Sequence, residues 1–437
     1  MTNRQGFSSR LGFVMAAAGS AVGLGNIWGF PTQAANQGGS AFILVYLIVI
    51  LLLAVPALYA ELLIGHTTRV NPVSALQQVC QGFPGLGRLA GYLNLLAAVM
   101  MLSFYSIIAG WMAAHAVGSV FSAIGLQQAA EFSTTQGLTR NLVFSGLIIL
   151  LSAAIILAGV KQGIEKWSKR LMPLLFVLLI LLISFILTLP GAEQGLARYL
   201  KADFSNILSA DLILAAMGQA FFSLSIGVGG MMIYGSYLAQ NEKLGRLTLS
   251  IAALDTSVAL LAGLLIIPAL YVAQEAGAII AQGNDLIGRS QLIFEVLPFL
   301  FEKLGWSGIV VSFAFFSLLS IASLTSTISS TEVPVAYLTE RREMPRKQAT
   351  ILVSCTVALL STIIMFNFDW LFRLVITLLT HYMLPLMGLF YFLVLGWLAA
   401  RSSLLPQKTS LQRLLAAYFR YVCPLMMATV FWHVASQ

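Results

Sequence analysis

Charged residues are scarce in this chain. Of its 437 residues, 9% are Asp, Glu, Lys or Arg, 59% are hydrophobic, and the mean hydropathy is +0.90. A soluble domain covers itself with charged side chains, so this composition excludes one and indicates an integral membrane protein in a lipid bilayer.

Histidine and cysteine are also rare, which removes several kinds of site. Three cysteines give no disulfide framework, and four scattered histidines argue against a zinc site. The glycine-rich segments lack the lysine of a nucleotide-binding P-loop. No catalytic cluster stands out at either membrane surface, so we expect no enzyme. Although the net charge is +8, no dense basic run with interleaved aromatic residues points to a nucleic-acid partner.

The hydrophobic residues fall into eleven stretches long enough to cross a membrane. Most of the 24 basic residues lie in loops on the same side as the N-terminus. This bias predicts a cytoplasmic N-terminus and an external C-terminus. The expected spans are residues 11–35, 41–65, 89–121, 140–159, 171–190, 212–238, 247–272, 306–338, 348–366, 370–399 and 414–434.

Two of these spans carry residues that disfavour a continuous helix. Residues 19–30 contain four glycines, a serine and an asparagine, and residues 218–230 again combine glycines with serines. Unwound backbone survives at membrane depth only around a buried site or a water-filled cavity. Glycine-rich segments also allow close helix packing, which is the alternative for either segment alone. Because the two spans lie five apart, the pattern favours an inverted-repeat transporter with its site at the breaks.

Oxygen-bearing side chains inside the spans suggest a hard cation as ligand. Glu61, Asp255 and Glu332 are the charged candidates, and residues 317–331 are rich in serine and threonine. Hydroxyl, carbonyl and carboxylate oxygens suit alkali cations. A serine in a helix can instead bond back to a carbonyl one turn earlier. Asp255 could ligate sodium or carry a proton, and both alternatives stay open.

The chain resembles the neurotransmitter:sodium symporter family over nearly its whole length. The resemblance rests on the run from Gly19 to Gly39 and on short matches around Glu61, Tyr105, Ser223, Ser323 and Arg420. It implies an all-α transmembrane protein of eleven helices, with helices 1 and 6 broken. Residues 1–437 would form one transporter domain, with inverted five-helix repeats over about 10–190 and 211–400 and an extra helix over about 411–434.

The resemblance also implies the ligands of two co-transported sodium ions and of an amino acid. One sodium site would use the Ala21 carbonyl with Asn26, Ser223, Asp255 and the substrate carboxylate. The second would use the carbonyls of Gly19, Val22 and Ala322 with Thr325 and Ser326. The substrate-binding residues would be Ser20, Ala21, Leu24, Gly25, Met101, Tyr105, Ile108, Phe222, Ser223, Ser225, Val228, Ser326 and Ser330.

Departures from the family pattern narrow the expected substrate. Monoamine carriers have an aspartate where this chain has Gly23, so we expect an α-amino acid. Val228 and Ser330 stand where a leucine carrier has larger residues, so we expect a large neutral, hydrophobic or aromatic one. The alternatives are a sodium-coupled carrier of an amine or osmolyte, and a non-transporting sensor or channel.

Three further expectations concern the gates and the ions. Many members have an arginine at the position of Gly29, paired with an aspartate whose counterpart here is near Arg373, so the outer gate is altered. Asp255 stands where others have asparagine, and its fixed charge predicts that no chloride is needed. Residues 270–305 are expected to form an external lid of two short helices, and the Gly163-x9-Pro173 motif is expected to let its helix unwind toward the cytoplasm.

Overall fold

The structure is a computed structural model, which describes residues 6–201, 204, 207–282, 285–286, 292–398 and 410–436. Nearly all of these residues are helical. The elements of the first half are α1 (Arg10–Ala21), α2 (Phe30–Asn36), α3 (Ser40–Val49), α4 (Val55–Thr68), α5 (Pro72–Val79), α6 (Pro84–Ala123), α7 (Gln127–Thr134), α8 (Leu138–Leu157), α9 (Lys166–Ile186) and α10 (Ala192–Leu200).

The second half continues with helices and one short pair of strands. Its elements are α11 (Ala210–Ser223), α12 (Gly230–Ser236), α13 (Leu244–Glu275), β1 (Ala281–Gln282), β2 (Asp285–Leu286), α15 (Leu297–Lys303), α16 (Trp306–Arg341), α17 (Arg346–Phe366), α18 (Phe368–Thr377), α19 (Leu384–Leu393), α20 (Ser410–Ala417) and α21 (Cys423–Ser436). Seven π-helical turns join or prolong these helices: Gly25–Gly29, Ile50–Ala54, Val160–Glu165, Leu292–Val296, Leu378–Met383, Val394–Leu398 and Tyr418–Val422.

Eight helices in the described part of the chain are long and apolar enough to cross a membrane, and one bent pair raises this to nine. The bent pair is the first predicted span, in which Arg10–Ala21 and Gly25–Asn36 meet at 51°. The other two predicted spans correspond to α11 with α12, which are separated by a non-helical stretch, and to the C-terminal helix of α20 and α21. Each of the eleven predicted spans therefore has a helical counterpart.

Local backbone conformation explains why the sixth predicted span breaks. Ser225, Gly227 and Gly229 have φ angles of 51°, 93° and 85°, which no right-handed helix can contain. Glycine adopts this region without steric cost, so the glycines at 227 and 229 allow the chain to leave the helix there. The side chain of Ser209 caps the start of α11 by accepting a hydrogen bond from the Leu212 N–H at 3.3 Å.

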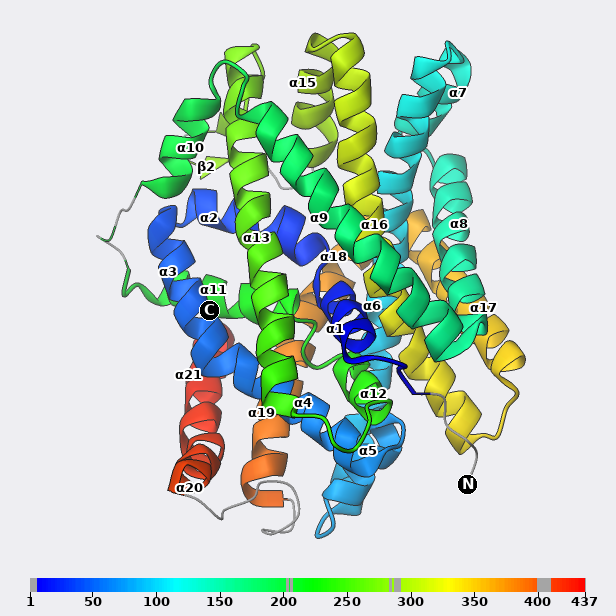
Figure 1. The fold of residues 1–437 in the computed structure, drawn as a ribbon, viewed down its shortest axis with the longest axis vertical. Helices are drawn as coiled ribbons and strands as arrows, with labels where there is room; N and C mark the ends of the chain where they lie inside the picture. The colour runs from blue at the N-terminus through cyan, green and yellow to red at the C-terminus, as the bar shows by residue number, and fades with distance from the viewer. Residues whose placement is uncertain are drawn as a thin grey trace.

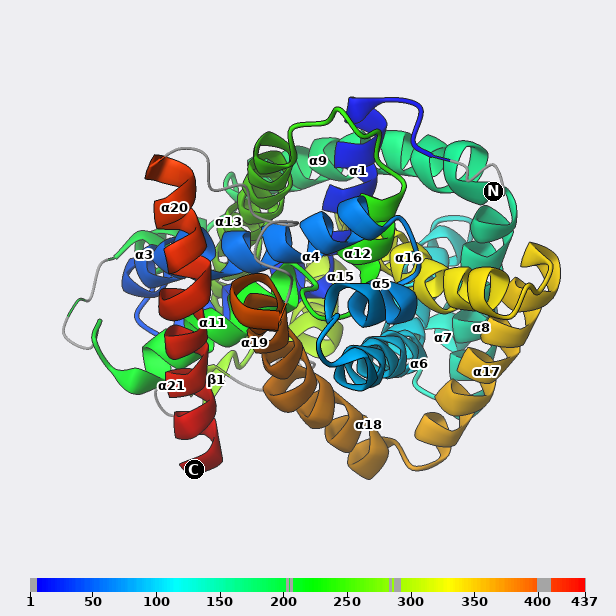
Figure 2. The same cartoon turned by 90° about the horizontal axis from the view of Figure 1, so that it is seen from below.

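The two broken spans lie inside the bundle, and longer helices surround them. In Figure 1, α7, α10 and α15 lie at the upper end of the molecule, while α5 and α20 lie at the lower end. The long helices α6 and α16 pack along one another, and α4 packs against α12. Viewed from below, α20 and α21 stand at the periphery, beside α3 and α19 (Figure 2).

The loop that we expected to contain two short helices differs from that prediction. Two-residue strands pair antiparallel, with Ala281 opposite Leu286 and Gln282 opposite Asp285, and one helical segment follows from Leu292 to Lys303. Residues 283–284 and 287–291 lie outside the described residues. Gly283, Asn284 and Asp285 have low intrinsic helix propensity, so the sequence here only weakly favours the first of the two expected helices.

Candidate substrate and ion site

The breaks bring Asn26, Ser223 and Asp255 together in a fully buried cluster. Asn26 lies in the π-helical turn after α1, Ser223 ends α11, and Asp255 lies in the middle of α13. The Asn26 amide Nδ2 donates to Asp255 Oδ1 at 2.7 Å and to Ser223 Oγ at 2.8 Å. Ser223 Oγ donates to Asp255 Oδ2 at 2.7 Å. These three side chains are the ones that the sequence assigned to the first sodium site.

The Asn26 amide is oriented with its nitrogen toward the carboxylate of Asp255. Its oxygen faces the other way and accepts the Gly23 N–H at 2.9 Å. A cation ligated by both Asn26 and Asp255 needs both oxygens directed at it. Sodium binding in this cluster would therefore require the Asn26 amide to turn over, with release of the Gly23 N–H.

A second group of oxygens surrounds Ser326 on α16. The Ser326 hydroxyl lies within 3.5 Å of four carbonyl oxygens, those of Gly19, Ser20, Val22 and Ala322. The hydroxyl has one hydrogen and can donate to only one of these carbonyl oxygens at a time. The group therefore offers oxygen lone pairs that could bind a cation. Thr325 Oγ1 lies 3.0 Å from the Ala322 carbonyl and adds a further oxygen. The residues proposed for the second sodium site thus lie close together.

Tyr105 on α6 reaches the unwound backbone of the first span. The Leu24 N–H donates to the Tyr105 hydroxyl at 2.7 Å, and Tyr105 is buried. A Cβ atom on Gly23 would lie 2.3 Å from Tyr105 Oη and 2.9 Å from Ser326 Oγ. Glycine is therefore required at position 23 for the tyrosine to approach. An aspartate there, as in monoamine carriers, could not be accommodated without displacing Tyr105.

The unwound stretch of the other broken span is held by a buried carboxylate. Glu61 on α4 accepts the Gly227 N–H at 3.1 Å and the Met232 N–H at 3.3 Å. These N–H groups belong to residues just before and within the first turn of α12, which have no helical partner of their own. Glu61 is thus a structural anchor of the break, and neither oxygen cluster includes this candidate.

A cavity of about 900 Å³ lies beside the breaks, and Gln136, which follows α7, and Glu295, which precedes α15, are among the residues that line it. Among the predicted substrate residues, Leu24, Tyr105, Ile108 and Phe222 line it. The ring of Phe222 also packs on the backbone of Gly25: a Cβ added to Gly25 would lie 3.0 Å from the ring. Phe222 therefore lies between the cavity and the unwound segment, as expected of an outer lid.

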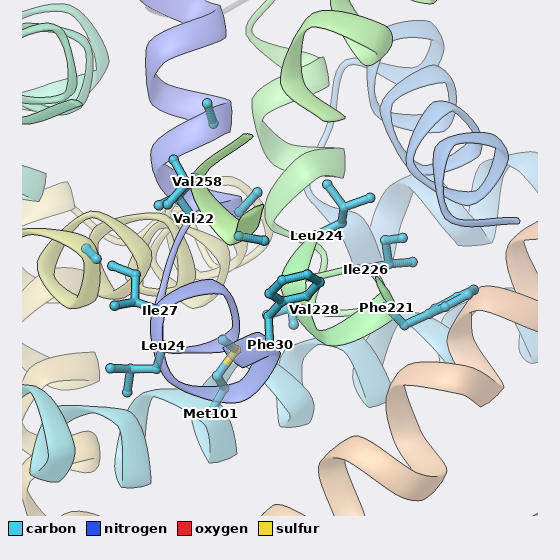
Figure 3. Close-up of a cluster of buried hydrophobic side chains, with 14 of the residues drawn as sticks. Val22, Leu24, Ile27, Phe30, Met101, Phe221, Leu224, Ile226, Val228 and Val258 are labelled. Carbon is cyan, nitrogen blue, oxygen red and sulfur yellow. The ribbon is translucent and has the colours of Figure 1, made fainter. Parts of the chain in front are cut away.

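The other predicted substrate residues lie deeper, around the breaks. Met101, Ser225, Val228 and Ser330 are buried. Figure 3 shows the apolar side chains gathered there from the first broken span, from α6 and from the stretch after α11, among them Leu24, Met101, Leu224 and Val228. The Ser20 hydroxyl donates to Ser329 Oγ at 2.7 Å, and the Ser20 carbonyl accepts the Ser225 hydroxyl at 3.3 Å.

At the place where the outer gate was expected, Gln219 stands beside Gly29. A Cβ on Gly29 would lie 2.9 Å from Gln219 Oε1, so the Gln219 side chain occupies the space beside Gly29. Gln219 Nε2 donates to the Gly25 carbonyl at 2.7 Å. Arg373 is exposed and does not line the cavity, although Asp369 and Phe372 on the same helix do. Aromatic residues complete the wall, including Trp28, Trp111 and Phe294.

Two buried carboxylates, Glu165 and Glu332, hold neighbouring elements together. Glu165 accepts the Ser8 N–H and the Ser8 hydroxyl at 2.7 Å each and lies 2.7 Å from Lys169 Nζ. A Cβ on Gly12 would lie 2.0 Å from Glu165 Oε1. Glycine at position 12 therefore allows the start of α1 to lie directly on the turn that contains Gly163. Glu332 on α16 pairs with Arg346 at 2.6 Å.

Comparison with known proteins agrees with these features. A sequence model of the sodium:neurotransmitter symporter family matches residues 4–139 and 126–433. The chain belongs to this family. A sodium-dependent transporter of Bacillus subtilis, YhdH, is 35% identical over 356 residues, which cover 78% of this chain and 74% of the relative. A sodium-dependent transporter of Methanocaldococcus jannaschii is 28% identical over 454 residues, 99% of this chain and 91% of the relative.

The fold agrees with that of a solved member of the family. The structure of MhsT in complex with L-phenylalanine superimposes with a TM-score of 0.86 at 34% sequence identity, covering 99% of this chain and 100% of MhsT. The predicted fold class is thereby confirmed: this is an all-α, multi-pass membrane protein and a sodium-dependent transporter, not an enzyme. Amino acids are substrates named for several relatives, including nutrient amino acid transporters of Drosophila.

Proposed function

We propose that the protein imports large neutral amino acids, hydrophobic or aromatic, together with two sodium ions, by alternating access. The observation that carries this proposal is the close approach of Tyr105 to the unwound backbone at Gly23 and Leu24, beside two clusters of oxygens. A substrate carboxylate could accept a hydrogen bond from the Tyr105 hydroxyl. It could also interact with the partial positive charge at the start of the helix that resumes at Gly25.

Two features favour an amino acid over an amine. Tyr105 Oη fills the place where an ammonium-binding aspartate would branch from residue 23. The side chains around the breaks, including Met101, Val228 and Ser330, are apolar or carry only hydroxyls. Such a lining accepts a bulky neutral side chain and penalises a charged one. The relative MhsT, whose structure contains L-phenylalanine, supports the same class of substrate.

The ion-binding part of the proposal follows from charge. Asp255 places a carboxyl group in the first cluster, and in its ionised form this group balances the cation there without chloride. We propose chloride-independent transport for this reason. Two sodium ions, each moving down about 100 mV and a tenfold gradient, would supply roughly 7 kcal/mol, enough to accumulate a zwitterion about 10⁵-fold. The membrane is proposed to be the bacterial inner membrane, with the N-terminus in the cytoplasm and the C-terminus outside.

The experiment that tests this function is a thermal-stability screen of the purified protein. Each of the twenty amino acids is added in sodium and again in potassium, and the unfolding temperature is recorded. We expect a few large neutral amino acids to raise it in sodium only. Stabilisation by amines or osmolytes instead would contradict the substrate class, and equal stabilisation in potassium would contradict sodium coupling.

A further inference from the structure

The C-terminal part of the chain carries positive charge without any acidic side chain. From residue 370 to the end there is no Asp or Glu, whereas Arg373, Arg401, Lys408, Arg413 and Arg420 lie there. Four of these five cations fall between residues 401 and 420, at the connection between the last two predicted spans and at the start of the final one. This connection therefore cannot neutralise its own charge.

Arg420 lies between two aromatic side chains. Its guanidinium carbon is 4.2 Å from the ring centre of Trp397 and 5.5 Å from that of Tyr421. Trp397 Nε1 donates to the Arg420 carbonyl at 2.9 Å, which fixes the indole beside the arginine. A Cβ on Gly396 would lie 2.7 Å from Arg420 Cα, so glycine at position 396 allows the two helices to approach here.

The charge of Arg420 has no counterpart in the described part of the protein. The ion pairs found there are Arg10–Glu242, Lys169–Glu165 and Arg346–Glu332. Arg420 Nε is buried and has no hydrogen-bond partner in the same residues. The sequence of residues 399–409 contains no carboxylate that could supply one. Because a guanidinium stays protonated in proteins, the site presents a permanent cation with free donor capacity.

The surroundings of Arg420 match the edge of a membrane. Trp397 and Tyr421 are 53% and 56% exposed, and the apolar side chains of Val422 and Leu425 are exposed on the same helix in the direction of the C-terminus. The helix stands at the periphery of the bundle (Figure 2). Exposed tryptophan and tyrosine next to an exposed apolar stretch are typical of the level of lipid headgroups.

We propose that Arg420, with Trp397 and Tyr421, binds the phosphate of an anionic phospholipid at this edge of the bundle. A guanidinium donates paired hydrogen bonds to phosphate, and the aromatic rings hold its plane in place. The acyl chains of the lipid would lie along Val422 and Leu425. The surplus of basic residues in this region favours a lipid with net negative charge over a zwitterionic one.

The test measures lipid-dependent stabilisation of the full-length protein in detergent. Phosphatidylglycerol, phosphatidylcholine or inorganic phosphate is added, and the unfolding temperature is followed in wild type, Arg420→Gln and the control Arg413→Gln, which removes an exposed charge from the same helix. We expect phosphatidylglycerol to stabilise wild type and Arg413→Gln more than phosphatidylcholine does. Arg420→Gln should lose at least half of that difference.

Three results would overturn the proposal. Arg420→Gln could keep all of the extra stabilisation by phosphatidylglycerol over phosphatidylcholine, or Arg413→Gln could lose as much of it as Arg420→Gln does. Inorganic phosphate could also stabilise wild type as well as the anionic lipid does, which would indicate a site for soluble phosphate. If Arg420→Gln fails to fold, quenching of tryptophan fluorescence by brominated lipids decides. Brominated phosphatidylglycerol should quench wild type more than brominated phosphatidylcholine, and Trp397→Phe should remove that difference. An unchanged difference in Trp397→Phe contradicts the site.

Discussion

Replacing Gly23 with alanine should weaken substrate binding through Tyr105. The added Cβ would lie 2.3 Å from Tyr105 Oη and 2.9 Å from Ser326 Oγ, both well inside van der Waals contact. Overpacking of this kind costs about 1–3 kcal/mol. If the strain is relieved by moving Tyr105 away from the substrate, affinity should fall about 5- to 150-fold.

The assay is a titration of the stabilising amino acid in sodium, with the dissociation constant taken from the thermal shift. Gly218→Ala is the matched control, because Gly218 also lines the cavity and its added Cβ would meet nothing within 4 Å. We expect Gly218→Ala to bind within about twofold of wild type, since an ordinary surface substitution changes free energy by less than ~0.5 kcal/mol.

A double-mutant cycle with Tyr105→Phe tests the mechanism itself. Removing the hydroxyl abolishes the closer of the two clashes and leaves the 2.9 Å contact with Ser326 Oγ, so Gly23→Ala should cost less in the Tyr105→Phe background than in wild type. The two effects are then non-additive, as expected for groups in direct contact. If Gly23→Ala binds like wild type, or if both effects add fully, Tyr105 does not control the site in the way argued here.

Three other substitutions test the ions and the inner end. Asp255→Asn removes the charge beside Asn26, so the sodium concentration needed for half of the stabilisation should rise at least about tenfold. Chloride should restore part of the sodium affinity of this variant. A wild-type protein that itself requires chloride would contradict this. Ser326→Ala removes an oxygen from the second cluster, and a loss of about 1 kcal/mol should raise the half-saturating sodium concentration roughly fivefold; an unchanged sodium titration contradicts the site. Glu165→Gln weakens charge-assisted hydrogen bonds to Ser8 worth about 1.5–3 kcal/mol, so amide exchange in residues 6–12 should accelerate tenfold or more; unaltered exchange would show that Glu165 does not hold this segment.

The broken spans and the oxygen clusters could be predicted from the sequence because each has a local chemical signal. Glycines within apolar spans mark the breaks, and serine, asparagine and aspartate at membrane depth mark the polar interior. The convergence of Asn26, Ser223 and Asp255 required the five-span offset together with the family resemblance, since these residues are far apart in the chain.

Other features depend on side-chain direction and could not be predicted. Nothing in the sequence indicates that the Ser20 hydroxyl turns to Ser329, because a serine has several rotamers of similar energy and the partner decides. The place of Gln219 beside Gly29 likewise depends on how the two broken spans pack. The strands Ala281–Gln282 and Asp285–Leu286 were mistaken for helix because their residues have no strong preference for either structure.

Uptake of labelled phenylalanine into proteoliposomes tests the central claim most directly. With an inward sodium gradient, the proposed symporter should accumulate the amino acid above its external concentration, and a sodium ionophore or replacement by potassium should abolish accumulation. Tyr105→Phe, with Gly218→Ala as control, should lower uptake. Accumulation that is equal in potassium, or none in sodium for any large neutral amino acid, would contradict the proposed function.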